Sequence, residues 1–382
     1  MKNRVWLACI MAAIALTSSA LVGPHKPASR PFCEQTDVFI AGENGYHTYR
    51  IPAAIVTAKG TVLAFCEGRK SGSGDTGDID TVLRRSFDGG RTWQPMQIVA
   101  DDGPNAIGNP CPVGDRNTGT IWLPLTRNLG SDVESRILDG TSKESRTVWI
   151  SKSTDDGATW SKPKELTATT QRPDWTWYAT GPGVGIQLRS GRLVIPCDHA
   201  VEGSKTYESH IIYSDDHGET WKLGGVVTPN VNECQVVERS DGALMLNMRS
   251  YFRNNRRMIA MSRDGGMTWS APVADPALIE PVCQASLIVG QVAKLPYRLL
   301  FSNPASTKRE NMTVRVSYDE GKTWPVARTL HAGPSAYSCL TVLPDGTIGC
   351  LYERGDKRYH EKITFAGFNS EWVAEGTGVD KR

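Results

Sequence analysis

Seven charged or phenolic side chains fall at corresponding points of short strand-like runs. Three begin the first strand of a predicted hairpin, namely Arg50, Glu233 and Tyr337. Four lie at or just beyond the end of a second strand, namely Arg69, Arg249, Arg309 and Glu353. Because the second strand of a hairpin returns to the level where the first began, these side chains are predicted to gather at one rim of the fold.

Three arginines near one point would be unfavourable without an anion. At about 5 Å and an effective dielectric near 20, each pair repels by roughly 3 kcal/mol. A guanidinium fork suits a carboxylate, so a cluster of Arg50, Arg249 and Arg309 indicates a carboxylate-binding site. The alternative is that the three are separate solvated or ion-paired residues. Glu353 is then either the partner that holds one arginine in place or half of a surface ion pair.

The hairpins belong to a repeat that runs through the chain. The pattern S-x-D-x-G-x-T-W occurs five times, at Ser86–Trp93, Ser153–Trp160, Ser214–Trp221, Ser262–Trp269 and Ser317–Trp324. The starts are 48 to 67 residues apart, which is typical of stacked units such as propeller blades. Each copy is predicted to be a turn in which Ser and Asp accept from backbone N–H groups, Gly takes positive φ and Trp packs on the blade.

A second pattern counts the blades independently. Apolar strands follow short turns at Lys59-Gly60, Thr118-Gly119, Ser190-Gly191, Asp241-Gly242, Pro296-Tyr297 and Asp345-Gly346. Each has another strand before it, which gives six hairpins with the five turns between them. The sequence therefore predicts an all-β fold, a six-bladed β-propeller with four-stranded antiparallel blades. Residues 35–382 are assigned to this single domain, and 21–34 to a segment before it.

The composition is that of an ordinary globular protein. The 382 residues include 39% hydrophobic and 22% charged side chains, which excludes intrinsic disorder. The net charge of +2 offers no bulk attraction for nucleic acid or an anionic membrane surface. Neither partner is expected, and the chain is expected to be a monomer.

Residues 1–20 resemble a secretory signal peptide. Lys2 and Arg4 precede an apolar run that ends at Leu16, and small residues follow up to Ala20. Twelve apolar residues are too few to span a bilayer. The sequence therefore predicts export to the periplasm or the medium; a buried N-terminal element is the alternative.

Eight cysteines remain after the predicted signal peptide. They show no C-x-x-C or zinc-like spacing, and all but Cys33 lie in apolar strand-like runs. Free buried thiols are favoured over a disulfide framework, because a thiol packs as a small hydrophobe. No metal or cofactor is expected.

The mature chain as a whole resembles the bacterial exo-α-sialidases (neuraminidases) of the six-bladed propeller type. The resemblance rests on Tyr49-Arg50-Ile51-Pro52, on the Asp-box repeats given above, and on an arginine triad that binds the sialic acid carboxylate. It assigns the triad to Arg50, Arg249 and Arg309. Sialylated glycans are the substrates that it implies.

The same resemblance assigns the remaining roles. Asn232-Glu233-Cys234-Gln235 matches the segment of the glutamate that activates the nucleophile, and Ser335-Ala336-Tyr337-Ser338 matches the nucleophile segment. Glu353 is implied to steady the first arginine, and Arg69 and Asp115 to contact the 4-hydroxyl region of the sugar. The acid/base aspartate is placed at Asp75, with Asp78 and Asp80 as nearby competitors.

The chemistry of the substrate accounts for these residue types. Sialic acid carries a carboxylate on its anomeric carbon, which would repel a carboxylate nucleophile, so a neutral phenol is preferable. Glu233 would take the phenol proton, and Asp75 would protonate the leaving oxygen and then deprotonate water. Two displacements retain configuration. The alternatives are a trans-sialidase or intramolecular trans-sialidase, which share the tyrosyl intermediate, and a non-catalytic glycan-binding propeller.

Overall fold

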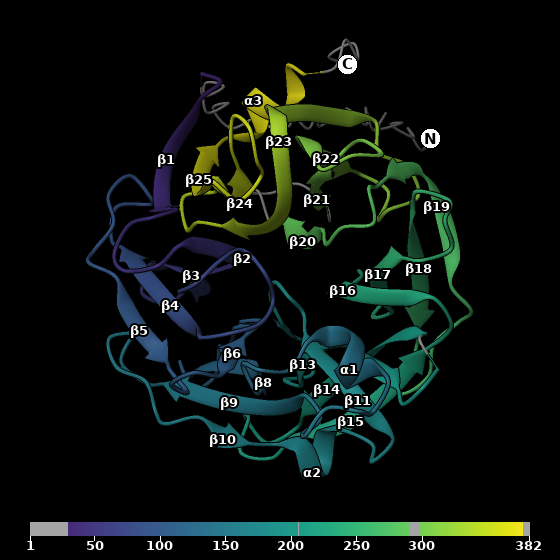
Figure 1. Ribbon diagram of the computed structural model, residues 1–382. Helices are drawn as coiled ribbons and strands as arrows, with labels where there is room; N and C mark the ends of the chain where they lie inside the picture. The colour runs from purple at the N-terminus through teal and green to yellow at the C-terminus, as the bar shows by residue number, and fades with distance from the viewer. Residues whose placement is uncertain (1–29, 205, 291–297, 377–382) are drawn as a thin grey trace, which may run out of the picture.

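A computed structural model describes residues 30–204, 206–290 and 298–376 (Figure 1). Its strands form six blades arranged in a ring around a central axis, with neighbouring strands antiparallel within each blade. The predicted fold class is thus confirmed. The predicted signal peptide at 1–20 and the turn at Pro296-Tyr297 lie outside the described residues.

Blades one and two come from the first part of the chain. Blade one contains β2 (Thr48–Val56), β3 (Val62–Arg69), β4 (Ile79–Ser86) and β5 (Gln97–Ala100). Blade two contains β6 (Ala106–Gly108), β7 (Val113–Gly114), β8 (Ile121–Asn128), β9 (Thr147–Ser153) and β10 (Lys164–Glu165). A single parallel pairing, Ile79 with Ala106, joins the two blades.

Blades three and four follow in the same order. Blade three contains β11 (Trp175–Thr180), β12 (Ile186–Gln187), β13 (Leu193–Val201), β14 (Tyr207–Ser214) and β15 (Lys222–Val227). Blade four contains β16 (Val231–Glu238), β17 (Leu244–Ser250), β18 (Arg256–Ser262) and β19 (Val273–Ile279). The innermost strands of blades two and three are broken into two pieces. Their middle segments contain Pro110, Pro112 and Pro182, which lack the N–H that a strand ladder needs.

Blades five and six share one long strand. Blade five contains β20 (Ser286–Gly290), β21 (Arg298–Pro304), β22 (Glu310–Ser317) and the first half of β23 (Val326–Val342). The second half of β23 begins blade six, followed by β24 (Ile348–Arg354) and β25 (Lys362–Phe368). The outer strand of blade six is β1 (Cys33–Ile40), which pairs with β25 and closes the ring (Figure 1). The propeller therefore begins at Cys33, two residues before the predicted start.

Helices are few and short in the described residues. They are α1 (Glu134–Leu138), α2 (Thr167–Thr170) and α3 (Ser370–Ala374). None of the helices described is long and apolar enough to cross a membrane.

The hydrophobic core lies between neighbouring blades. Leu63, Phe65 and Leu83 of blade one pack in one cluster with Ile121 and Leu123 of blade two, and all five side chains are buried. Burying both faces of each blade explains why the inner strands are almost continuously apolar. The eight cysteines of the described chain are free thiols, and all but Cys33 are buried.

The five repeated turns have the predicted hydrogen bonds. In the first copy, Ser86 Oγ accepts from the Gly90 N–H at 2.8 Å, and Asp88 Oδ1 accepts from the Thr92 N–H at 2.9 Å. Gly90 has φ +90°, and a Cβ there would come within 2.3 Å of the Phe365 ring. Only glycine therefore fits this close approach of blade one to blade six.

Candidate active site

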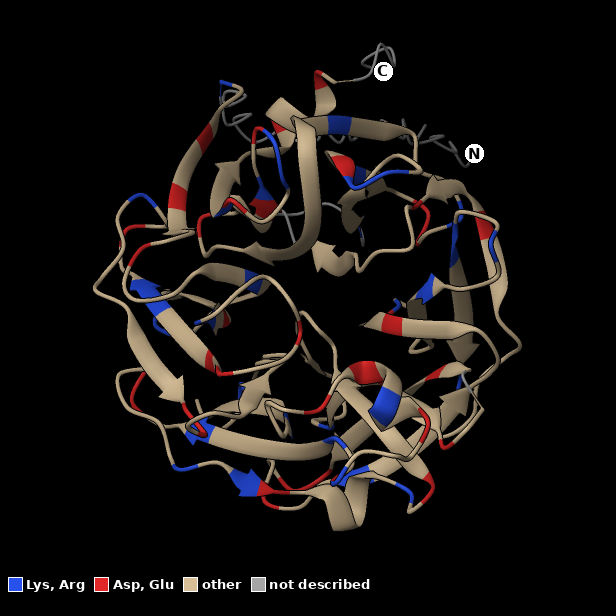
Figure 2. Cartoon of the chain, in the orientation of Figure 1, with Lys and Arg blue, Asp and Glu red and all other residues tan. Residues whose placement is uncertain are grey.

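The rim opposite the repeated turns contains a cavity of about 260 Å³ on the propeller axis. Figure 2 shows a basic segment of β2 and an acidic segment of β16 on either side of the central axis of the ring. Seven predicted site residues line the cavity: Arg50, Arg69, Asp75, Glu233, Arg249, Arg309 and Tyr337. The structure therefore brings together residues that lie up to 287 positions apart in the chain.

Bulges at the start of two inner strands aim the central side chains. In β16 the pairing passes from Val231–Ser250 to Cys234–Met248, so three steps on one strand match two on the other. In β23 it passes from Ser335–Arg354 to Ser338–Tyr352 in the same way. Glu233 and Tyr337 lie within these bulges. A bulge redirects a side chain, which explains how both enter the cavity from strands that otherwise face the core.

Tyr337, Glu233 and Arg249 form one hydrogen-bonded group. The phenol Oη of Tyr337 donates to Glu233 Oε1. Arg249 Nη1 donates to Glu233 Oε2 at 2.7 Å and to Tyr337 Oη at 3.2 Å. Burial, together with the negative charge of Glu233, raises the pKa of Tyr337 well above its ordinary value, although the nearby arginines oppose the shift. The phenol is therefore protonated at neutral pH and needs a base before it can act as a nucleophile.

Glu353 holds Arg50 in place, which is the first of the two alternatives predicted for it; the other was a surface ion pair. Glu353 is fully buried and accepts from Arg50 Nε at 2.8 Å and from the Ile51 N–H at 2.9 Å. Its second oxygen accepts from the Tyr337 N–H at 3.2 Å. Ile51 has φ +61°, an unfavourable conformation for a β-branched residue. One carboxylate thus fixes both Arg50 and the backbone of Tyr337.

Arg309 makes no ion pair with any described residue. Its guanidinium carbon lies 5.6 Å from the ring centroid of Tyr337 and 5.1 Å from that of Tyr359. The Arg50 guanidinium lies over the same two rings, at 5.0 and 5.3 Å. Two guanidinium groups beside aromatic faces keep N–H donors available for an incoming anion.

The three candidate aspartates occupy different positions relative to the axial cavity. Asp75 lies in the loop between β3 and β4, lines the cavity, and pairs with Arg69 Nη2 at 2.7 Å. Asp78 pairs with Lys70, and Asp80 is fully buried, where it accepts from Tyr46 Oη at 2.6 Å. Of the three, only Asp75 faces the cavity. Burial tends to raise its pKa, but the charges of Arg69 and Arg50 outweigh this and lower it.

The placement of Asp115 in the sugar site is wrong. Its carboxylate is buried on the opposite side of the ring, where it accepts from Gln187 Nε2 at 2.7 Å and contacts His217 Nδ1 at 2.9 Å. His217 belongs to the third repeated turn. Asp115 follows β7 and adjoins the hairpin turn at Gly119, so it lies at the turn end of the hairpin. It stabilises that turn and does not line the cavity.

Several cavity residues were missed by the sequence analysis. They are Glu67, Asn109, Glu134, Arg146, Asp198, Tyr207, Tyr251 and Tyr359. Trp177 also lines the cavity. Glu67 was detectable, because it lies two residues before Arg69 on β3 and thus on the same face. Its Oε2 accepts from Arg69 Nη2 at 2.6 Å. The others lie on loops, on strands and at the start of α1, without a repeated pattern.

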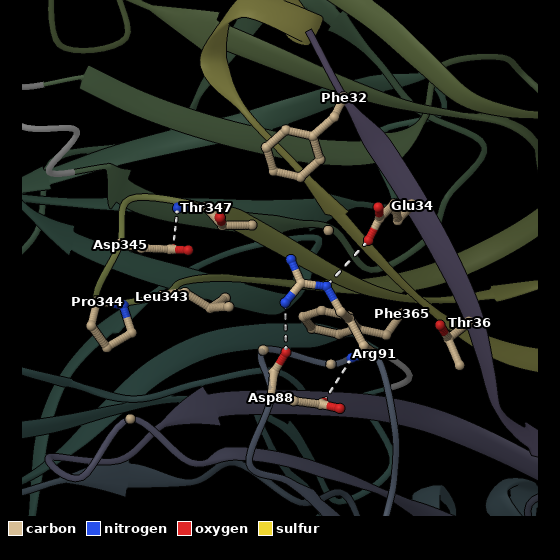
Figure 3. A pocket seen from close by; sticks show the side chains of 14 residues that line it. Phe32, Glu34, Thr36, Asp88, Arg91, Leu343, Pro344, Asp345, Thr347 and Phe365 are labelled. Atoms are coloured by element: carbon tan, nitrogen blue, oxygen red, sulfur yellow. Dashed lines mark hydrogen bonds and ion pairs between the residues drawn. The ribbon is translucent and has the colours of Figure 1, made fainter. Parts of the chain in front are cut away.

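A second cavity of about 310 Å³ lies on the turn face, where blade six meets blade one. Phe32, Glu34, Asp88, Arg91 and Phe365 are among its lining residues (Figure 3). Arg91 reaches toward Glu34 at 3.5 Å and bonds to Asp88 within its own turn. None of the predicted site residues lines this cavity, so the chemistry is assigned to the axial one.

Known proteins are similar to this chain in both sequence and fold. A family model for the BNR repeat-like domain matches residues 60–350. An exo-alpha-sialidase of Aspergillus fumigatus is 34% identical over 87% of this chain and 86% of its own. The chain belongs to the sialidase family. The solved structure of the Hadza microbial sialidase Hz136 is 35% identical, has a TM-score of 0.79, and is matched over 87% of this chain and 68% of its own.

Two bacterial relatives are longer than this chain. A sialidase of Micromonospora viridifaciens is 36% identical over 96% of this chain, and one of Bacteroides fragilis is 35% identical over 82%. This chain spans 58% and 61% of their respective lengths.

Proposed function

We propose that this sialidase-family chain is a retaining exo-α-sialidase that releases terminal α-linked sialic acid from glycoproteins, glycolipids and oligosaccharides. The observation that carries the proposal is the buried Tyr337–Glu233–Arg249 group inside a cavity with further arginines. A glycan-binding propeller would have no use for a phenol paired with a base. Close relatives named sialidase or exo-alpha-sialidase support the same activity.

In the first step, the three arginines Arg50, Arg249 and Arg309 bind the substrate carboxylate and orient the sugar. Tyr337 Oη attacks the anomeric carbon while its proton passes to Glu233. The glycosidic bond breaks, and the leaving oxygen takes the proton of Asp75. The product of this step is a sugar bound covalently to the tyrosine.

In the second step, water attacks the anomeric carbon and loses a proton to Asp75. The phenol oxygen leaves and regains its proton from Glu233, so the enzyme returns to its starting state. Because each displacement inverts the configuration, the released sugar retains the α-anomeric form.

Tyr337→Phe tests this proposal, because it removes the nucleophilic oxygen and leaves the arginines in place. Hydrolysis of sialyllactose should collapse by orders of magnitude, and a fluorinated sialosyl fluoride should label Tyr337 in the wild-type protein only. Proton NMR of the first product should show the α-anomer. A label on a carboxylate, a β-anomer, or full retaining activity in the variant would contradict the mechanism. A transfer or anhydro-sugar product would show a trans-sialidase instead.

We also propose that the protein is exported after cleavage near Leu21, acts as a monomer and binds no nucleic acid. The apolar run behind Lys2 and Arg4 and the near-neutral net charge support these points. Mass spectrometry of exported material should find a chain that starts near Leu21. Recovery of an intact N-terminus would refute cleavage. The molar mass from light scattering tests whether the protein is a monomer.

A further inference from the structure

Arg146 is a buried arginine on the wall of the axial cavity. Its exposed fraction is 7%, and it lines the cavity beside Asn109 and Trp177. Its Nη2 donates to Asn109 Oδ1 at 2.6 Å, and its guanidinium carbon lies 4.4 Å from the ring centroid of Trp177. Its Nε has no hydrogen-bond partner. Within the described part of the chain, no carboxylate lies at ion-pair distance from it.

The other arginines of the cavity differ in their ion pairs. Arg50, Arg69 and Arg249 each pair with a carboxylate, and the free Arg309 is assigned to the substrate carboxylate. A buried guanidinium with unpaired N–H groups is unfavourable. The cavity therefore contains a further unused donor, Arg146 Nε, which an acceptor on the ligand would satisfy.

The blade order places Arg146 across the cavity from the reacting end. Arg309 and Tyr337 come from blades five and six, whereas Arg146 directly precedes β9 of blade two and Trp177 lies on β11 of blade three. In a ring of six blades, two and three lie opposite five and six. The pyranose of sialic acid has six ring atoms, and C5 is the atom opposite the anomeric C2. A sugar attacked at C2 by Tyr337 thus directs its C5 substituent toward Arg146.

We propose that Arg146 is a specificity-determining residue that donates a hydrogen bond to a hydroxyl group on the C5 substituent of the sugar. The inference rests on the sialidase activity proposed above. An N-acetyl group offers only its carbonyl oxygen and ends in a methyl, whereas an N-glycolyl group adds a terminal hydroxyl and a bare 5-hydroxyl carries its oxygen directly on the ring. Sites built to bind a hydroxyl discriminate strongly against analogues that lack it. Sialosides with a hydroxyl at this end are therefore the preferred substrates.

The experiment compares kcat/KM for three 4-methylumbelliferyl α-sialosides that carry N-acetyl, N-glycolyl or hydroxyl at C5. In Arg146→Met, which keeps an unbranched chain against Trp177, the preference for a hydroxyl-bearing substrate over N-acetyl should fall about ten-fold or more. The substrate whose advantage disappears identifies the oxygen that Arg146 binds. Arg146→Lys, which keeps the charge and a donor, should retain part of the preference.

Arg192→Met is the matched control. Its guanidinium also stacks on an aromatic ring, 4.1 Å from the centroid of Tyr213, but it pairs with Asp215 outside the cavity. This variant should leave all three values unchanged. If Arg146→Met lowers the three values by one common factor, or leaves their ratios unchanged, Arg146 is merely structural and the inference is overturned. Failure of the wild-type protein to hydrolyse any of the three would instead refute the proposed activity.

Discussion

Replacing Glu353 with Gln should lower the free energy of unfolding by more than the loss of a single ion pair would. The carboxylate is fully buried and accepts four N–H bonds: from Arg50 Nε at 2.8 Å, from Arg50 Nη2 at 3.3 Å, from the Ile51 N–H at 2.9 Å and from the Tyr337 N–H at 3.2 Å. An amide presents one oxygen and adds an NH₂ that faces the same donors. Removing one partner of a buried pair leaves an uncompensated charge, so Glu353→Gln should lower the free energy of unfolding by about 3–5 kcal/mol.

Urea unfolding followed by tryptophan fluorescence measures this loss. The matched control is Glu219→Gln, which breaks an exposed pair with Lys152 at 3.3 Å and should change the free energy of unfolding by less than about 1 kcal/mol. The folded fraction of Glu353→Gln should also show a raised KM, because Arg50 and the backbone of Tyr337 lose their common support. Unfolding energies within 1 kcal/mol of wild type, together with an unchanged KM, would show that Glu353 does not hold Arg50.

Three further predictions concern the site and its surroundings. Arg309→Ala should lower kcat/KM mainly through KM, by about 1.5–3 kcal/mol for each charged hydrogen bond lost; unchanged kinetics would remove Arg309 from the triad. Although burial opposes it, Arg69 and Arg50 lower the pKa of Asp75, so the fraction of protonated acid, and kcat/KM for sialyllactose, should fall as pH rises above about 4. Asp75→Asn should abolish that pH dependence and spare aryl sialosides, whose leaving group needs little protonation; equal losses on both substrates would contradict its role. Burial lowers the pKa of His199 and His210, so unfolding takes up protons and stability should fall as pH drops below about 6.5, with a weaker pH slope in His210→Gln.

Most of the architecture could be predicted from the sequence because the fold is built from repeats. Turn residues at regular intervals fix the hairpins, and hairpin geometry alone places Arg50, Glu233 and Tyr337 at one rim. The same rule would have corrected Asp115, which precedes the turn at Gly119 and so belongs to the far rim. The resemblance to the family implies the sugar site for this residue, and hairpin geometry contradicts it.

Other features of the site have no signal in the sequence. Arg146 and Tyr359 lie on connecting segments, where side-chain direction follows from contacts between blades and from no period of the chain. The strand β1 could not be assigned to blade six, because its partner β25 lies more than 300 residues away. Long-range pairing of this kind is decided by closure of the ring. The sequence of an edge strand does not identify the strand with which it pairs.

The bulges explain why equal sequence spacing corresponds to equal roles in blades four and six. Glu233 and Tyr337 are each the second residue of a bulge, and Arg249 and Glu353 are the single residues opposite them on the next strand. The shared spacing of 16 residues thus records one hairpin geometry used twice. Blade one has the same irregularity between Arg50 and Ala53, but its second bulge residue is Pro52, which offers no polar side chain. The bulge there serves a different purpose: it turns the Ile51 N–H toward Glu353, so that blade one contributes the arginine that blade six holds in place.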